Sequence, residues 1–183
     1  ADKFPAGLSE GEVRHALRYL VWELNGFPKW LEKVYRTHPN LVLEAVQVEL
    51  RWELMQTGSD QPVNYVLHDL VYHAPWMHQD LVPLISEWLL QHDTFPPDAL
   101  RHCIHILESG NANGVTISKL AQSKISDKSA KGQWANWYAL WVDVDAAKAI
   151  PAVEGWLSSL PFDEASAEAQ LFITSLMGSR RSS

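Results

Sequence analysis

The chain has 183 residues, of which 46% are hydrophobic and 20% are charged, a balance typical of a folded protein that argues against disorder. With a formal net charge of −7, the chain has no overall electrostatic attraction to phosphate, on which nucleic-acid binders depend. The single cysteine, Cys103, excludes an intrachain disulfide and fits a reducing compartment. No apolar run reaches the roughly 18–20 residues of a membrane-spanning helix, and the first residues lack a signal-peptide core, so we expect a soluble, cytoplasmic protein.

Helical periodicity begins close to the N-terminus, where apolar residues recur at spacings of three and four. Ser9 followed by Glu12 is the pattern of a capping box. We predict helices over 10–24, 28–38, 40–56, 62–74, 76–91, 97–109, 114–126, 130–143, 145–159 and 163–177, and no strand. A clear break is expected at 57–60, and the glycine- and asparagine-rich loop 110–114 is the best candidate for a hinge or an insertion.

The helix predicted over 40–56 is apolar on two sides. One stripe consists of Leu43, Val46, Leu50 and Leu54, and the other of Leu41, Ala45, Val48 and Trp52. A helix with two apolar faces is usually covered by neighbours on both, so we expect stacked helices around it. The acidic residues of this helix, Glu44, Glu49 and Glu53, are interpreted as a solvated face or as partners of Arg51.

An internal repeat relates residues 81–89 to residues 149–157. Both segments are apolar and place a proline five residues before a tryptophan. The segments that correspond in the second helix of each unit are 12–17, 41–46 and 99–104. Helix pairs of this kind cannot bury their apolar faces alone, so they stack into a continuous core.

This pattern resembles the HEAT repeat, which pairs a first helix, often bent by proline, with a second helix that opens on an apolar-Arg-x-small pattern. The unit over 76–109 fits best, and its matching positions are Pro83, Asp93, Leu100, Arg101 and Cys103. In the HEAT family the turn aspartate and the second-helix arginine commonly form a ladder between repeats. The sequence departs from the family at Leu43, where arginine is expected, and in its last unit, around Ala165 and Ala167.

The resemblance implies an all-α protein, an α-α superhelix of about 9–10 helices stacked as antiparallel HEAT-like pairs in a single domain over 1–183. It also implies a non-enzymatic scaffold that binds a protein or peptide partner, and it leaves the partner and the oligomeric state open. The chain opens on a helix of the second type without its first-helix partner, which indicates either an atypical cap or a fragment of a longer solenoid, and we favour the fragment. Similar repeats occur as sensor regions of bacterial signalling ATPases of the NACHT type, which is the parent protein that the resemblance favours.

The chain has eight histidines, and two groups invite a metal interpretation. His102 and His105 lie one helical turn apart near Asp98, but two nitrogens and a distant carboxylate favour solvated surface histidines. His68-Asp69 resembles the paired ligand of HD-type hydrolases. However, His73 follows His68 by about 140° around a helix, so we predict that the two do not converge. No glycine-rich phosphate loop, nucleophile elbow or zinc-binding cysteine set occurs, so we expect no metal, cofactor or active site.

Four aromatic residues of the predicted helix over 130–143 share one face, namely Trp134, Trp137, Tyr138 and Trp141. One interpretation is a core seam with the indole nitrogens bonded at its edge. The other is a partly exposed groove that binds a peptide or helix, which makes these four the candidate partner-binding residues. The alternative function is a HEAT-like DNA glycosylase or other DNA-binding protein. Such an enzyme requires a catalytic carboxylate among aromatics, and Asp143 and Asp145 near Trp141 are the candidates, although the acidic composition opposes DNA binding.

Overall fold

The computed structural model describes residues 4–23, 26–55 and 65–179. The α-helices in these ranges are α1 (Glu10–Leu17), α2 (Leu31–Thr37), α3 (Pro39–Met55), α4 (Tyr65–His73), α5 (His78–Gln91), α6 (Pro97–Ser109), α7 (Gly114–Ser126), α8 (Trp134–Ser158) and α9 (Phe162–Ser179). Two 3₁₀ segments, η2 (Pro75–Met77) and η3 (Lys128–Gln133), precede α5 and α8. No strand occurs in the described part of the chain, so the predicted all-α class is confirmed.

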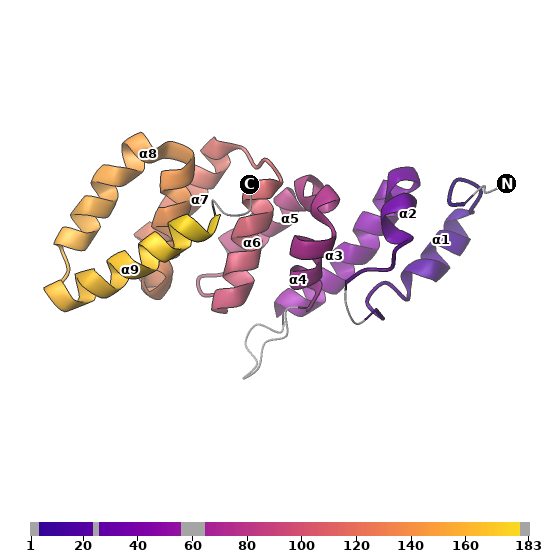
Figure 1. Cartoon of the computed structure of the whole chain (residues 1–183), viewed down its shortest axis with the longest axis horizontal. Helices are drawn as coiled ribbons and strands as arrows, with labels where there is room; N and C mark the ends of the chain where they lie inside the picture. Colours follow the sequence, from indigo (N-terminus) through magenta and orange to yellow (C-terminus); the bar gives the residue numbers. More distant parts are fainter. Residues whose placement is uncertain (1–3, 24–25, 56–64, 180–183) are drawn as a thin grey trace.

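The helices follow one another along the long axis of the molecule, from α1 at one end to the α8–α9 hairpin at the other (Figure 1). The main interhelix contacts connect helices that are close in sequence: α1 and α2 with α3, α3 with α4, α4 and α5 with α6, α5 with α7, α7 with α8, and α8 with α9. The chain is therefore an elongated row of packed helices. Its winding into a HEAT-type superhelix stays a prediction.

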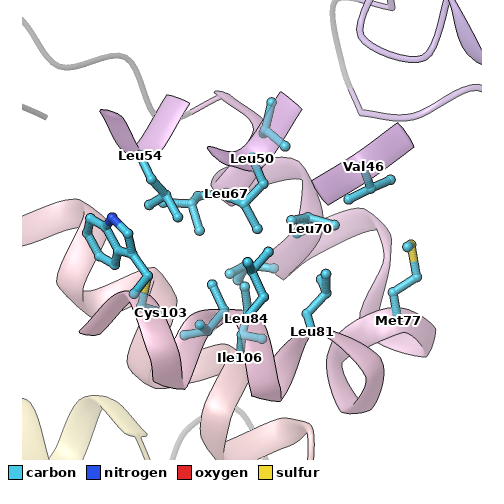
Figure 2. Packing of buried hydrophobic residues seen from close by; sticks show 14 of the residues in the cluster. Val46, Leu50, Leu54, Leu67, Leu70, Met77, Leu81, Leu84, Cys103 and Ile106 are labelled. Carbon is cyan, nitrogen blue, oxygen red and sulfur yellow. The ribbon is translucent and has the colours of Figure 1, made fainter. Parts of the chain in front are cut away.

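The apolar residues form two clusters that meet at α8. The larger cluster extends from α1 to the first half of α8, and Figure 2 shows its central part, where side chains of α3, α4, α5 and α6 interdigitate. The smaller one joins both halves of α8 to α9, with Tyr138 and Trp156 among its buried members. Ile125 of α7 packs against both clusters. Each cluster is built by helices adjacent along the chain, which is why the core is elongated as well.

Among the described helices, the largest difference from a predicted end is at the C-terminus of α1. The helix predicted over 10–24 ends at Leu17, and the chain continues in turns held by bonds from the amides of Tyr19 and Leu20 to carbonyls three residues earlier. This tighter winding turns Leu20 into the core, where it is 1% exposed. The capping box of Ser9 and Glu12 at the start of α1 is confirmed. The break predicted at 57–60 lies outside the described residues.

The helices predicted over 130–143 and 145–159 form one continuous run, α8, with a kink between them. Asp145 at the kink is not helical (φ −152°, ψ 65°). Its carboxylate accepts a hydrogen bond from the Lys148 ammonium at 2.7 Å and is also bonded to the Lys148 backbone, and both bonds lower the pKa of Asp145. A carboxylate bonded to the amide three residues later is the arrangement of a helix N-cap, so Asp145 starts the second half of α8.

The two repeated segments are buried in the same way. In residues 81–89 and 149–157 the first, fifth and eighth positions lie in the core, and both internal prolines, Pro83 and Pro151, are exposed. The tryptophans at the eighth position, Trp88 and Trp156, are 8% and 7% exposed. Each proline is on the solvent side of its helix, where the carbonyl that loses its backbone partner is open to water.

The loop over 110–114, predicted to be a hinge, is closely packed against α5. Gly110 is buried, and a side chain there would lie 2.7 Å from Val82 and 2.8 Å from the His78 carbonyl oxygen. Asn111 has a left-handed φ of 54°, and Asn113 caps α7 by accepting the Val115 amide at 2.8 Å. This packing favours a fixed connection between α6 and α7.

Among the described helices, none has the length and apolarity to cross a bilayer.

Candidate interaction surface

The outer face of α3 is a continuous apolar stripe exposed over its C-terminal half. Its members are Leu41, Ala45, Val48, Trp52 and Met55. At 3.6 residues per turn they fall within a sector of about 80° on the side away from the buried face of α3. Val48, Trp52 and Met55 are 62%, 63% and 77% exposed, whereas Leu41 and Ala45 are half-buried. The expectation that neighbours cover both faces of this helix was therefore wrong for the second face.

The spacing of the α3 stripe is that of a helix–helix seam. Its members are separated by four, three, four and three residues, the alternation of the a and d positions in a coiled coil. Positions beside the seam are charged: Glu44 and Arg51 border one edge and Glu49 borders the other. Glu44 is held by Arg14 of α1 at 2.9 Å, so α1 fixes the N-terminal part of this edge. The seam is open where Val48, Trp52 and Met55 lie.

Glu53 fixes the C-terminal end of α3 against α4. Its carboxylate accepts the amides of Val66 at 2.6 Å and Leu67 at 2.9 Å, in the first turn of α4. A helix N-terminus has free amide donors that need such partners. Glu53 is only 3% exposed, and burial raises its pKa to about 7 against the opposing effect of these bonds. The interpretation of Glu53 as a solvated residue was wrong, because it lies in the buried sector of α3 beside Leu54.

Cys103 of α6 lies near the Glu53 carboxylate. It is fully buried, and burial and then the charge of Glu53 raise the pKa of its thiol. A thiol that stays protonated and has no access to solvent is chemically inert. This region therefore supports the fold beneath the α3 seam.

The histidines of α4 do converge, contrary to the prediction from their spacing. One ligand atom each from His68, Asp69 and His73 lies within 4.8 Å of the other two. Asp69 falls between the two histidines around the helix axis, and an imidazole is long enough to reach across the remaining angle. The ring centroids of His68 and His73 are 6.3 Å apart, and His68 Nδ1 lies 3.4 Å from the Asp69 carboxylate. Two imidazoles and a carboxylate can hold a divalent metal ion.

The histidines of α6 are not the solvated surface groups that the sequence favoured. His102 is 6% exposed and His105 is half-buried, while Asp98 bonds Arg101 at 3.1 Å on the exposed side. Burial, followed by the charge of Arg101, lowers the pKa of His102 to about 4. Its ring lies edge-on to His68 at 6.0 Å between centroids, which brings the two groups of histidines together.

The four aromatic residues of α8 are divided between the two clusters of the core. Trp137 is fully buried in the larger cluster, and Tyr138 is stacked on Trp156 at 4.6 Å in the smaller one. Trp134 and Trp141 are half-buried; the Trp134 indole donates to the Asp127 carbonyl at 3.1 Å. This burial favours the core-seam interpretation, but only the Trp134 indole has the expected partner, whereas the buried indole nitrogens of Trp137 and Trp141 have none. A role of these four residues in partner binding stays a prediction.

A shallow hollow of about 230 Å³ lies at the α8 end of the molecule, between η3, α8 and α9. Its wall includes Trp156, Lys131 and Glu168. Burial raises the pKa of Glu168, and the positive charge of Lys131 partly offsets the rise. The hollow therefore pairs an aromatic surface with charges of both signs, at a place to which no sequence motif pointed.

The two aspartates considered as catalytic residues of a DNA glycosylase, Asp143 and Asp145, interact with neighbouring charged residues of the chain. Asp145 caps the second half of α8, as described above. Asp143 is exposed and raises the pKa of Glu108, which reaches about 7 mainly through burial. Trp141 is half-buried. The structure adds no observation that favours the DNA-binding alternative.

The ladder implied by the HEAT resemblance does not form through Arg101. Its guanidinium bonds Asp98 of its own helix at 3.1 Å, and both side chains are 70% exposed. Asp93 instead lies 3.6 Å from the ammonium of Lys124 in α7. A lysine from the next helix thus contacts the turn aspartate expected to pair with arginine.

Lys124 is 3% exposed and joins α7 to the turn between α5 and α6. Its ammonium donates to the carbonyls of Leu90, at 3.4 Å, and His92, and it lies 5.8 Å from the centre of the Phe95 ring. No sequence motif pointed to this residue. The sequence feature that could have indicated it is a lysine on the apolar face of the helix, one turn after the buried Leu120 and Ala121.

No protein-family profile, no curated protein and no solved structure matches the chain. The class that the fold defines is thus an all-α protein with its helices in an elongated row, and its function has to be argued from its own surfaces.

Proposed function

We propose that the chain is a non-enzymatic, HEAT-like helical-repeat scaffold that binds a protein partner in the cytoplasm, as a region of a larger protein. The binding surface in this proposal is the α3 seam, and the occupant is an amphipathic helix of the partner. The observation that supports it most is the exposure of Val48, Trp52 and Met55 on a seam with coiled-coil spacing.

The three exposed side chains of the α3 seam would gain free energy on burial by a partner. Covering a large apolar side chain contributes about 1.5–3 kcal/mol. Val48, Trp52 and Met55 are all more than 60% exposed, so most of that gain is still available to a partner. Tryptophan is also the residue type most enriched among those that dominate interface energies. A helix laid along the seam gains several kcal/mol before the cost of association is counted.

The charges beside the seam define the chemistry of the partner helix. Glu49 on one edge favours a lysine or arginine opposite it, and Arg51 on the other edge favours a glutamate or aspartate. These charges select partner and orientation more than they add affinity. We therefore expect apolar residues at alternating spacings of three and four, flanked by charges of opposite sign on its two edges.

A helical-peptide library panned against the folded chain tests this proposal. Two variants serve for comparison, Val48→Glu in the seam and Val115→Glu on α7; the two valines are 62% and 63% exposed, so the substitutions differ in place and not in burial. We expect selected peptides to show the alternating apolar spacing and to bind the wild type and Val115→Glu at least about tenfold more tightly than Val48→Glu.

Peptides that bind both variants equally, or that lack the apolar spacing, overturn the proposal. So does self-association that Val48→Glu abolishes in analytical ultracentrifugation, because a second copy of this chain is then the occupant. Far-UV circular dichroism of both variants confirms that the comparison is between folded proteins.

A further inference from the structure

We propose that His68, Asp69 and His73 form a binding site for a divalent transition-metal ion of the zinc type on the exposed side of α4. The juxtaposition that supports it is one ligand atom from each side chain within 4.8 Å of the other two. This site is independent of the α3 seam, so each proposal stands or fails separately.

The distances require only a small closure. Metal–ligand bonds to histidine and carboxylate are about 2.0–2.2 Å, so two ligand atoms on one ion lie about 4 Å apart or less. His68 and His73 are exposed side chains and can rotate toward Asp69 by the remaining distance. Asp69 is half-buried at 21% side-chain exposure and therefore forms the fixed member of the set.

Neighbouring groups contact the rings of both histidines. The His73 ring lies against the backbone of Gly26, where a side chain would approach its Cγ to 2.7 Å. The His68 ring contacts Tyr72 at 4.7 Å and the buried His102 at 6.0 Å between centroids. Ligands restricted in this way lose less conformational entropy when they bind an ion.

The donor set indicates the class of metal. Two imidazole nitrogens and one carboxylate oxygen suit Zn²⁺, Cu²⁺, Ni²⁺ or Fe²⁺, whereas Mg²⁺ and Ca²⁺ prefer oxygen ligands alone. Three protein ligands leave a fourth tetrahedral position for water or for a ligand from another molecule.

The test is isothermal titration of the tag-free chain with Zn²⁺, together with the visible absorption spectrum of the chain with Co²⁺. The variants are His73→Ala and Asp69→Asn, and the matched control is His15→Ala, which removes an exposed histidine of α1. We expect one Zn²⁺ per chain, a loss of at least about tenfold in affinity for each site variant, and no such loss for the control. Co²⁺ bound in a tetrahedral site gives visible d–d bands that the site variants lose.

The proposal is overturned if the wild type binds no Zn²⁺ up to about 1 mM, or if His73→Ala and Asp69→Asn bind it as tightly as the wild type. Equal weakening by His15→Ala also overturns it, since binding is then spread over surface histidines. If His73→Ala loses its helical circular dichroism, His68→Ala replaces it, because the His68 side chain is 53% exposed and lies on the surface.

Discussion

Replacing Glu53 by glutamine should change how the stability of the fold depends on pH. Burial raises the pKa of Glu53 from its ordinary 4.5 to about 7, because a charge there loses more hydration than its two amide bonds return. The raised pKa means that the folded state holds a proton that the unfolded chain has already released. The stability that Glu53 contributes is therefore fully present below pH 4.5 and is lost as pH rises through about 7.

The magnitude follows from the size of the shift. A shift of 2.5 units, at about 1.36 kcal/mol per unit, gives about 3 kcal/mol. Glutamine is uncharged at every pH and keeps an oxygen that accepts one amide. Relative to the wild type, Glu53→Gln should gain about 3 kcal/mol in free energy of unfolding as pH rises from about 4.5 to about 8.

Urea denaturation of both proteins across this pH range measures the effect. The difference between them isolates Glu53 from other groups that titrate, including Glu108, whose pKa burial also raises to about 7. Parallel pH profiles would show that Glu53 is charged in the fold and that its bonds to the α4 amides outweigh burial. Glu53→Ala should lose stability at every pH, by about 1–3 kcal/mol for each amide left unpaired.

Three further predictions concern the core. Lys124→Met should lower the free energy of unfolding by about 2–3 kcal/mol, because it leaves two carbonyls of the α5–α6 turn without their charged donor. Trp137→Ala should cost about 3–5 kcal/mol, whereas Trp52→Ala should cost less than about 0.5 kcal/mol, because Trp137 is 0% and Trp52 is 63% exposed. His102→Leu should keep more of its free energy of unfolding in acid than the wild type. Between pH 6.5 and about 4 the unfolded wild-type chain binds a proton at His102 that the folded chain does not, so its free energy of unfolding falls by about 3 kcal/mol.

Chemical denaturation followed by circular dichroism measures all three. Lys119→Met, at an exposed position of the same helix, is the control for Lys124, and equal losses would contradict the structural role of the buried ammonium. Equal costs for the two tryptophan substitutions would contradict the division between core and open seam. A His102→Leu profile parallel to the wild type in acid would show that His102 is protonated within the fold.

Much of the helical order was predictable because it depends on local signals. The capping box at Ser9 and the turn at 110–114 lie close in sequence to the helix boundaries they set, and α6 and α7 were predicted with their observed bounds. The end of α1 was not predictable in this way. Residues 18–21 continue the apolar pattern, and only packing shows that Leu20 reaches the core from a turn and not from a helix.

Which faces are covered could not be read from the sequence. Both stripes of α3 are apolar, yet one lies in the core and the other is open in its C-terminal half, because coverage depends on where α1, α2 and α4 lie. Helical spacing likewise placed four aromatics of α8 on one face, but Trp137 and Tyr138 point into different clusters. The angle of about 140° between His68 and His73 around the helix axis did not predict that they converge, because the imidazole side chains are long enough to reach toward each other.

The most direct test of the proposed function is the affinity of one selected helical peptide for three forms of the chain: the wild type, Val48→Glu and Val115→Glu. We expect that only the change in the α3 seam weakens binding, by about tenfold or more, and that the α7 variant matches the wild type. Equal affinities for all three forms would contradict it, because an open apolar seam on α3 would then have no part in recognition.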